Sequence, residues 1–134
     1  MQGNPVGWFE IYVQDIARAK AFYENVFQLT LEALPAPESP EWQKDCAGKM
    51  EMLSFSLSDE GYGATGALIR MDEVPSGPGG TLVYFKCEDC AEEAARAVEN
   101  GGSIFREKTS IDPHGFIAIV NDTEGNMIGL HSMK

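Results

Sequence analysis

One carboxylate stands among aromatic residues in the first apolar stretch of the chain, which reads Trp-Phe-Glu-Ile-Tyr-Val. This composition predicts a β-strand, and strand alternation puts Trp8, Glu10 and Tyr12 on the same face. A carboxylate on an apolar face is costly unless it is paired or solvated. One interpretation is that Glu10 acts as a general base or as an anchor for a cationic ligand, with Trp8 as a stacking wall. The alternatives are an internal salt bridge to Lys86 or Arg70, or an exposed position.

Later strands supply further side chains that could meet a ligand. Alternation places the following on one face: Leu82, Tyr84, Lys86, Met127, Gly129 and His131. A histidine there could act as a catalytic acid or base, the alternative being an ordinary exposed or hydrogen-bonded residue. The tyrosine could contact a ligand or serve packing alone. Catalytic candidates are thus Glu10 and His131, within an aromatic and apolar pocket typical of a ligand site.

Two cysteines form a C-x-x-C pattern at a predicted strand-to-helix junction, Cys87 and Cys90. Glu88 and Asp89 lie between them, and negative charge raises the pKa of a thiol. Zinc would need a second pair of ligands, for which Cys46 and two scattered histidines are poor material. We expect small buried or half-buried residues here, with redox or zinc chemistry as the alternative.

Other conspicuous residues have simpler explanations. His114 lies in a predicted hairpin loop that proline and glycine explain without a function. Trp42 lies in a Pro-rich excursion and could be a lid residue or a dimer contact. The glycines of residues 77–80 precede a strand and not a helix, so they form no phosphate-binding loop.

The elements that position these residues occur twice, at an offset of 74 residues. Repeat one spans about residues 6–73, residues 74–80 form a linker, and repeat two spans about residues 81–132. In repeat one we predict strands and a helix at 8–13, 17–27 (helix), 29–34, 50–57 and 64–71. In repeat two we predict them at 81–87, 91–100 (helix), 103–109, 116–120 and 127–131. Asp15 and Asp89 stand where helix N-caps belong, so each repeat reads βαβββ.

Two such repeats within a single domain of residues 1–134 predict an α+β protein. Its two curved, mostly antiparallel sheets would face a shared cleft. The segments WFEIYVQD at 8–15, AFYENVF at 21–27 and NDTEGNMIGLH at 121–131 resemble the vicinal oxygen chelate superfamily. That group includes glyoxalase I, extradiol dioxygenases, fosfomycin resistance enzymes and bleomycin resistance proteins. The resemblance implies the glyoxalase/bleomycin resistance fold and a homodimer.

The resemblance also implies where a metal would bind, on the first and fourth strands of each repeat. The matching residues are Trp8, Leu82, Gly129 and a residue at or near Gly66. None of these side chains can ligate a divalent cation. We therefore expect no metal and no other cofactor.

Composition limits the partners. The chain has 134 residues, with 21 acidic and 10 basic ones, for a net charge of −11. Such a surface repels nucleic acid and anionic membranes and favours a neutral or cationic small molecule, although the charge could simply keep the protein soluble. No apolar run approaches the roughly 20 residues of a membrane span, and no signal peptide is evident, so we expect a cytoplasmic protein.

These observations predict metal-independent binding of a small, apolar molecule that can be cationic, in the cleft between the sheets. The ligand-binding residues would be Trp8, Glu10, Tyr12, Leu82, Tyr84, Met127 and His131. The alternative is a glyoxalase-like lyase or isomerase that uses Glu10 and His131 as acid and base, with or without a divalent metal. A third alternative is an interaction module without a small-molecule ligand.

Overall fold

The computed structural model describes residues 3–45, 50–58 and 60–134. It divides into two compact units, which we describe in turn. The repeat-one unit comprises Trp8–Ala36 and Gly48–Thr81. The repeat-two unit comprises Met1–Gly7, Pro37–Ala47 and Leu82–Lys134.

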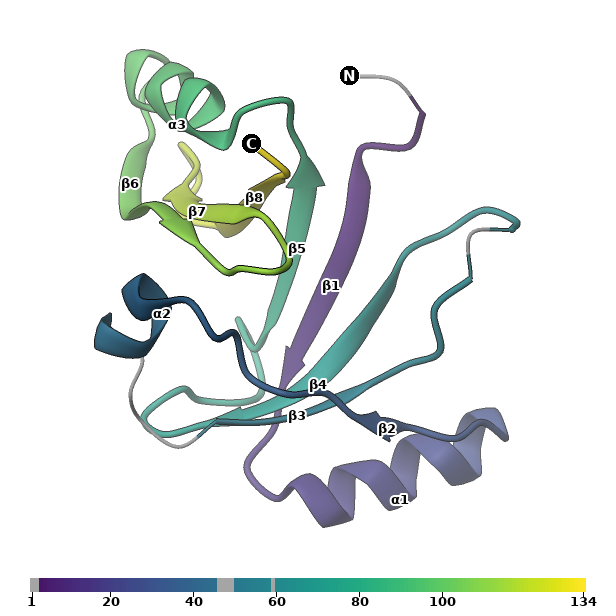
Figure 1. The fold of residues 1–134 in the computed structure, drawn as a ribbon. Coiled ribbons are helices and arrows are strands. Elements are labelled where there is room, and N and C mark those ends of the chain that lie inside the picture. Colours follow the sequence, from purple (N-terminus) through teal and green to yellow (C-terminus); the bar gives the residue numbers. More distant parts are fainter. Residues whose placement is uncertain (1–2, 46–49, 59) are drawn as a thin grey trace. The chain divides into compact units, whose positions relative to one another are not determined.

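The repeat-one unit is a four-stranded sheet with one helix on one face (Figure 1). Its elements are β1 (Val6–Tyr12), α1 (Ile16–Phe27), β2 (Glu32–Ala33), β3 (Met50–Ser54) and β4 (Thr65–Met71). The strand order is β2-β3-β4-β1, in which β1 and β4 are parallel and the other pairs antiparallel. Helix α1 contacts the sheet through Tyr23, whose ring meets Phe55 edge-on at a centroid distance of 5.9 Å. Phe55 in turn contacts Phe9 of β1, so these rings form the interface between helix and sheet.

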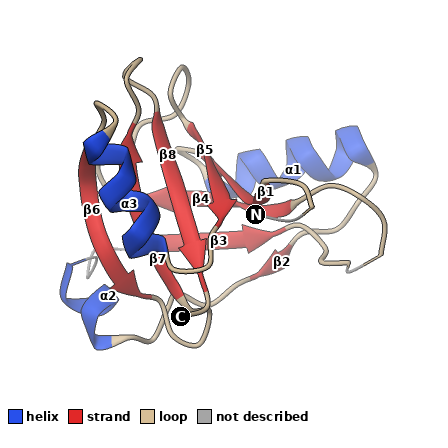
Figure 2. Cartoon of the chain, turned by 90° about the horizontal axis from the view of Figure 1, so that it is seen from above, coloured by secondary structure: helices blue, strands red, loops and turns tan. Residues whose placement is uncertain are grey.

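The repeat-two unit repeats this topology (Figure 2). Its elements are β5 (Thr81–Lys86), α3 (Cys90–Glu99), β6 (Ser103–Ser110), β7 (Phe116–Asn121) and β8 (Met127–Ser132), joined by the short helix α2 (Pro40–Asp45). The strand order β5-β8-β7-β6 matches β1-β4-β3-β2, again with a parallel pair of first and fourth strands. The core under α3 consists of Cys90, Ala94, Ala118, Val120 and Leu130.

The predicted α+β fold of two βαβββ repeats is therefore confirmed. Both predicted N-caps are also confirmed. The Asp15 carboxylate accepts a hydrogen bond from the Arg18 backbone N–H, and the Asp89 carboxylate accepts one from the Ala91 N–H, each at 3.0 Å. The two caps lie at the offset of 74 residues that the sequence showed.

Two predicted strands are shorter than expected. The strand predicted at 29–34 comprises only β2, because the Leu31 backbone N–H donates to the Glu24 carboxylate at 2.8 Å instead of to a neighbouring strand. The strand predicted at 50–57 ends at Ser54. Beyond it, the Thr65 hydroxyl donates to the carbonyl of Ser56 at 2.9 Å, which holds the chain outside the regular ladder.

Helix α2 was not predicted, although its sequence carries a start signal. Ser39 is buried, and its hydroxyl accepts from the Trp42 backbone N–H at 3.1 Å, while Pro40 is the first helical residue. A serine cap followed by proline is typical of a helix start. The Pro-rich composition around it concealed this signal.

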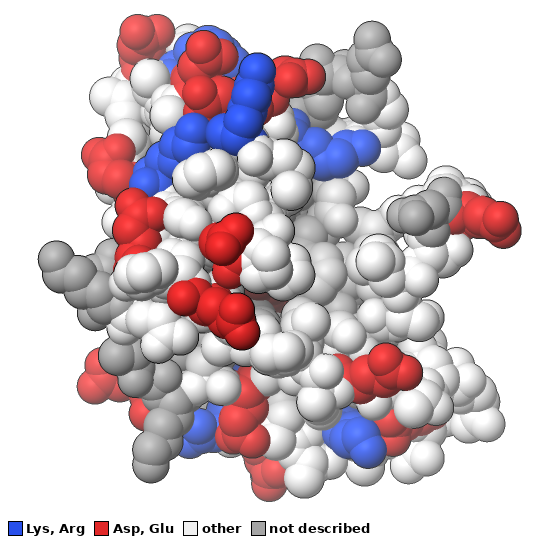
Figure 3. All heavy atoms as spheres, viewed as in Figure 1, with Lys and Arg blue, Asp and Glu red and all other residues white. Residues whose placement is uncertain are grey.

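Acidic side chains are spread over the face drawn in Figure 3, where basic ones are fewer and more clustered. Within the part of the chain that the structure describes, each helix is too short or too polar to cross a bilayer.

Candidate functional site

The Glu10 carboxylate is held by two donors from its own strand. The Trp8 indole Nε1–H donates to Glu10 Oε2 at 3.1 Å, and the Tyr12 hydroxyl donates to Glu10 Oε1 at 2.6 Å. All three side chains are half-buried. The prediction that Trp8, Glu10 and Tyr12 share one face is thus confirmed. Each oxygen of the Glu10 carboxylate accepts a hydrogen bond that fixes its orientation.

Strands β4 and β3 place apolar side chains, together with the hydroxyl groups of Thr65 and Ser54, on the same face as this carboxylate. Residues opposite each other in register share a face, and β4 places Ala67 opposite Glu10 and Ile69 opposite Tyr12. In the next strand, Met52 lies opposite Ile69. Ser54, opposite Ala67, and Glu32 of β2, opposite Ser54, lie on the same face at the far edge of the sheet. Among the described residues of β1, β3 and β4, Glu10 is the one carboxylate on this face. We call it the Glu10 face.

Arg70, one of the ion-pair partners considered for Glu10, lies on the opposite face. Its guanidinium lies 3.4 Å from the Asp72 carboxylate and 3.8 Å from that of Glu51. Lys86, the other candidate, runs along the N-terminal segment of the repeat-two unit. A Cβ atom on Gly7 would lie 2.8 Å from Lys86 Cγ, so the glycine makes room for the lysine chain.

Tyr84 of the repeat-two unit is buried, with 5% of its surface exposed, and stands opposite Gly129 of β8. A Cβ atom on Gly129 would overlap the Tyr84 ring. The ring therefore occupies the space into which any side chain at position 129 would project. Leu82, two residues earlier on the same face, is 6% exposed and belongs to the core.

His131 is tied to the β6–β7 turn. Its Nε2 atom lies 2.6 Å from the carbonyl oxygen of His114, so Nε2 carries the proton and donates it. Because Nε2 is occupied, a proton transfer between His131 and a ligand would have to use Nδ1. Met127, at the start of the same strand, is exposed. The structure thus brings Trp8, Glu10 and Tyr12 together in one unit and places Leu82, Tyr84, Met127 and His131 in the other.

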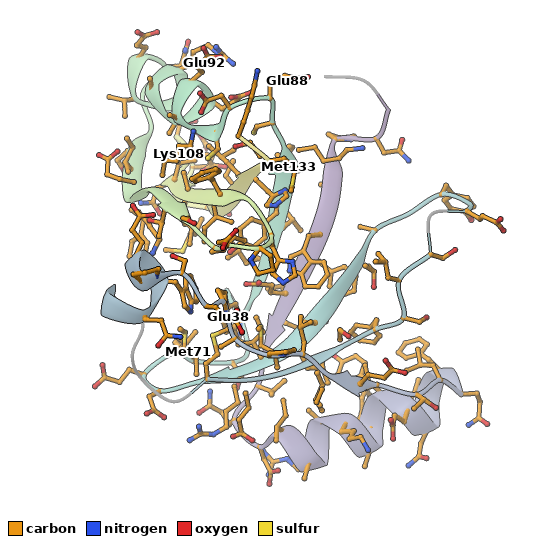
Figure 4. All side chains as sticks on the ribbon, in the orientation of Figure 1. Glu38, Met71, Glu88, Glu92, Lys108 and Met133 are labelled. Carbon is orange, nitrogen blue, oxygen red and sulfur yellow. The ribbon has the colours of Figure 1, made fainter. Side chains whose placement is uncertain are left out.

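Lys108 forms an ion pair and a ring contact within the repeat-two unit (Figure 4). Its Nζ lies 2.9 Å from the Asp89 carboxylate and 4.7 Å from the centre of the Phe116 ring. The hydrogen bond from Lys108 lowers the pKa of Asp89, and the same bond raises the pKa of Lys108. This pair fixes the start of α3 to β6.

Comparison with known proteins adds the family. A sequence profile of the Glyoxalase/Bleomycin resistance protein/Dioxygenase superfamily matches residues 6–130. The chain belongs to this superfamily. No curated protein sequence matches the chain significantly.

Several solved structures share the fold. A methylmalonyl-CoA epimerase variant from Streptomyces coelicolor, in complex with 2-nitronate-propionyl-CoA, is 14% identical, with a TM-score of 0.65 over 96% of this chain and 94% of that one. The methylmalonyl-CoA epimerase from Mycobacterium tuberculosis is 15% identical, with a TM-score of 0.65 over 97% and 88%. A hypothetical protein from Bacillus halodurans C-125 is 14% identical, with a TM-score of 0.67 over 99% and 96%. Identities this low show a common fold and nothing about ligands.

The positions that the superfamily's metal-dependent members use for ligands do not fit a divalent cation here. Trp8 offers only an N–H donor, Leu82 has no donor atom, and the space at Gly129 is filled by Tyr84. In repeat one, the register makes Ala67 the counterpart of Gly129, since Glu10 corresponds to Tyr84. Over residues 3–45, 50–58 and 60–134, no group of three or more His, Cys, Asp or Glu side chains could hold a metal ion.

The cysteines are packing residues, as predicted. Cys90 is fully buried, and Cys87 is half-buried. Burial first, then the charge of Glu93, raises the pKa of the Cys87 thiol to about 11, and burial also raises the pKa of Cys90. The acidic neighbour of Cys87 is thus Glu93 of α3, and not the two acidic residues between the cysteines. Cys46 lies outside the described residues.

Trp42 packs within the repeat-two unit. The Arg106 guanidinium of β6 lies 5.8 Å from the centre of its ring, and Glu41 Oε2 accepts from the Ser110 backbone N–H at 2.5 Å. Helix α2 therefore attaches the excursion from repeat one to the edge strand β6. Trp42 itself is half-buried, and its two possible roles, a lid residue or a dimer contact, stay open.

Proposed function

We propose that this superfamily member binds a small apolar molecule through the Glu10 face, without a metal. The observation that carries the proposal is the Glu10 carboxylate, fixed by Trp8 and Tyr12 on a face where the neighbouring strands also present Ala67, Ile69 and Met52. A carboxylate whose orientation is set before binding can direct a ligand's charged or donor group with little further ordering.

The ligand class follows from the side chains on this face. Trp8 and Tyr12 offer aromatic surface, which attracts cations and flat apolar groups. Met52 adds a polarisable side chain that adapts to different shapes. Together with the net charge of −11, these features favour an apolar organic cation over an anion.

The test is a thermal-shift screen of apolar organic ammonium compounds and their neutral isosteres, followed by calorimetry on the best binder. We expect Glu10→Gln to weaken binding of the cation at least 10-fold and to leave its neutral isostere within about 2-fold. Glu51→Gln removes an equal charge from the opposite face and is the matched control, so it should bind like the wild type. Equal affinity of wild type and Glu10→Gln for the cation would overturn the proposal.

An acid–base enzyme is the second candidate. The observation that favours it is the 2.6 Å hydrogen bond from the Tyr12 hydroxyl, which sets a proton donor against the Glu10 carboxylate. The epimerases that share this fold act on acyl-CoA compounds by their names, which makes a 2-methyl acyl thioester a reasonable substrate to try. Proton exchange at its α-carbon in D₂O, followed by NMR, would be lost in Glu10→Gln if this candidate holds. In His131→Ala, a role for His131 Nδ1 would remove one limb of the pH–rate profile.

An absence of any thermal shift across cations, neutral compounds and acyl thioesters would favour the interaction module instead. The expected homodimer and cytoplasmic location are also parts of this proposal.

A further inference from the structure

The Glu10 face has a polar end and an apolar end when its side chains are taken in rows across β1, β4 and β3. The first two rows hold a carboxylate and two hydroxyl groups, and we call them the polar end: Trp8 and Thr65, then Glu10, Ala67 and Ser54. The next two rows are the apolar end: Tyr12, Ile69 and Met52, then Met71 and Met50. Helix α1 packs on the other face of the sheet, where Tyr23 contacts Phe55, and so does not cover this one (Figure 1).

The apolar end combines a buried centre with half-buried side chains around it. Ile69 is 2% exposed, and the Tyr12 hydroxyl is directed to Glu10, so its polar atom belongs with the polar end. Three of the chain's six methionines are half-buried neighbours in this end: Met50, Met52 and Met71 (Figure 4). Methionine is flexible and polarisable, and it is used on surfaces that adapt to different apolar ligands. This end therefore suits a flexible apolar chain.

The second repeat shows that the fold does not require this division. At the corresponding positions of the repeat-two unit, aromatic and aliphatic side chains replace the Glu10 carboxylate and the Ser54 hydroxyl. Basic side chains replace Tyr12 and Ile69 there. The four residues are, in the same order, Tyr84, Ile119, Lys86 and His131. The polar and apolar ends are thus a property of repeat one alone.

We infer that the ligand is a linear organic cation whose alkyl chain has about ten carbons, an inference that rests on the proposed function of the Glu10 face. The ammonium group lies against the Glu10 carboxylate, and the chain follows β4 across the apolar end. Glu32 of β2 stands opposite Ser54 and continues the row of Glu10, so a second negative charge favours a cation there. The ring of Trp8 adds a surface that attracts cations.

The strand geometry sets the length of the alkyl chain. Ala67 and Met71 are four residues apart on β4, a span of roughly 13 Å, which is the length of an extended chain of about ten carbons. Each carbon up to this length should tighten binding about 2- to 4-fold, because it removes apolar surface from water. Met71 is the last residue of β4, and Met50, opposite it, is the first of β3. Further carbons extend beyond these strands and should add little.

The positions of the methionines allow the alkyl chain to be located by NMR. Protein labelled with ¹³C at the methionine methyl groups is titrated at neutral pH with n-alkylammonium chlorides, from butylammonium to tetradecylammonium, below their micelle concentrations. Of the three methionines on the face, butylammonium should shift only the signal of Met52, whereas decylammonium should also shift those of Met50 and Met71. Met133 of the repeat-two unit is 68% exposed and is the control, so its signal should stay in place.

Calorimetry with the same series measures how affinity depends on length. Affinity should rise with each carbon up to decylammonium and then level off, and n-alkanols of equal length should bind more weakly throughout. Met71→Gln places an amide at the far end of the alkyl chain. It should weaken decylammonium binding about 5-fold or more and leave butylammonium binding within about 2-fold. Met71→Leu keeps an apolar side chain and should bind like the wild type, as should Met133→Gln.

Two results with the wild type, which do not depend on how the variants fold, would overturn this inference alone. One is an affinity that keeps rising to tetradecylammonium, and the other is bound decylammonium that leaves the Met50 and Met71 signals unchanged. In both cases the proposed function stands if Glu10→Gln still weakens binding. A series that binds the wild type and Glu10→Gln equally, or that does not bind at all, would overturn the proposed function and this inference together.

Discussion

At the scale of single residues, Tyr84 and Gly129 depend on each other. A Cβ atom at position 129 would overlap a ring that is 5% exposed and has little room to move. We expect Gly129→Ala to lower the free energy of unfolding by about 1–3 kcal/mol, the range typical of overpacking in a core. Urea denaturation measures this change.

The double variant Tyr84→Leu/Gly129→Ala separates this contact from other effects of the glycine. Because a smaller side chain at position 84 makes room for the new methyl group, the second substitution should cost much less in the Tyr84→Leu background. Additive effects of the two substitutions would show that the ring does not limit position 129.

The Cys87 thiol should be unreactive at neutral pH. Burial and the charge of Glu93 raise its pKa from an ordinary value of 9.0 to about 11, so at pH 8 about one thiol in a thousand is ionised. Mass spectrometry after iodoacetamide treatment should find Cys87 unlabelled in the native protein and labelled in urea. Glu93→Gln should speed native labelling, and rapid labelling of the native wild type at pH 8 would contradict the assignment.

The same shift makes stability depend on pH. The native state keeps the Cys87 proton to a higher pH than the unfolded chain does, so the stabilisation is complete below pH 9.0 and is lost as the pH rises toward about 11.

At the scale of elements, the N-cap of α1 can be tested alone. The Asp15 carboxylate accepts from the Arg18 backbone N–H, and none of the α1 residues is fully buried, so the cap should matter for this helix. We expect Asp15→Ala to destabilise the protein by about 1 kcal/mol, whereas Asp15→Asn should retain most of the stability. Equal melting temperatures for Asp15→Ala and wild type would show that packing alone holds the helix.

An element can be predicted from the sequence when the residues that determine it lie close together in the chain. Both long helices and their caps follow from spacing and from one aspartate each, signals contained within a few residues. Helix α2 is different, because its attachment relies on Arg106 and Ser110, more than 60 positions away in the sequence. The cause of the short β2 is closer in the sequence, because the Glu24 carboxylate accepts from the Leu31 backbone N–H only seven residues later, but residue spacing alone does not reveal such a side-chain bond.

At the scale of the molecule, one part of the candidate site could be predicted from the sequence and another part could not. The common face of Trp8, Glu10 and Tyr12 follows from strand alternation alone. The hydrogen bonds that fix the Glu10 carboxylate depend on how the Trp8 and Tyr12 side chains are oriented. The Tyr84 ring fills the space beside Gly129 because of the register between β5 and β8. Neither leaves a pattern in a single sequence.

The most direct test of ligand binding at the Glu10 face uses the two tryptophans of the chain. Trp8 donates its indole N–H to Glu10, whereas the ring of Trp42 lies beside Arg106. In ¹H–¹⁵N NMR spectra, titration with the apolar cation found in the screen should shift the Trp8 indole signal and leave that of Trp42 unchanged. A bound ligand that leaves the Trp8 signal in place would contradict the proposed site.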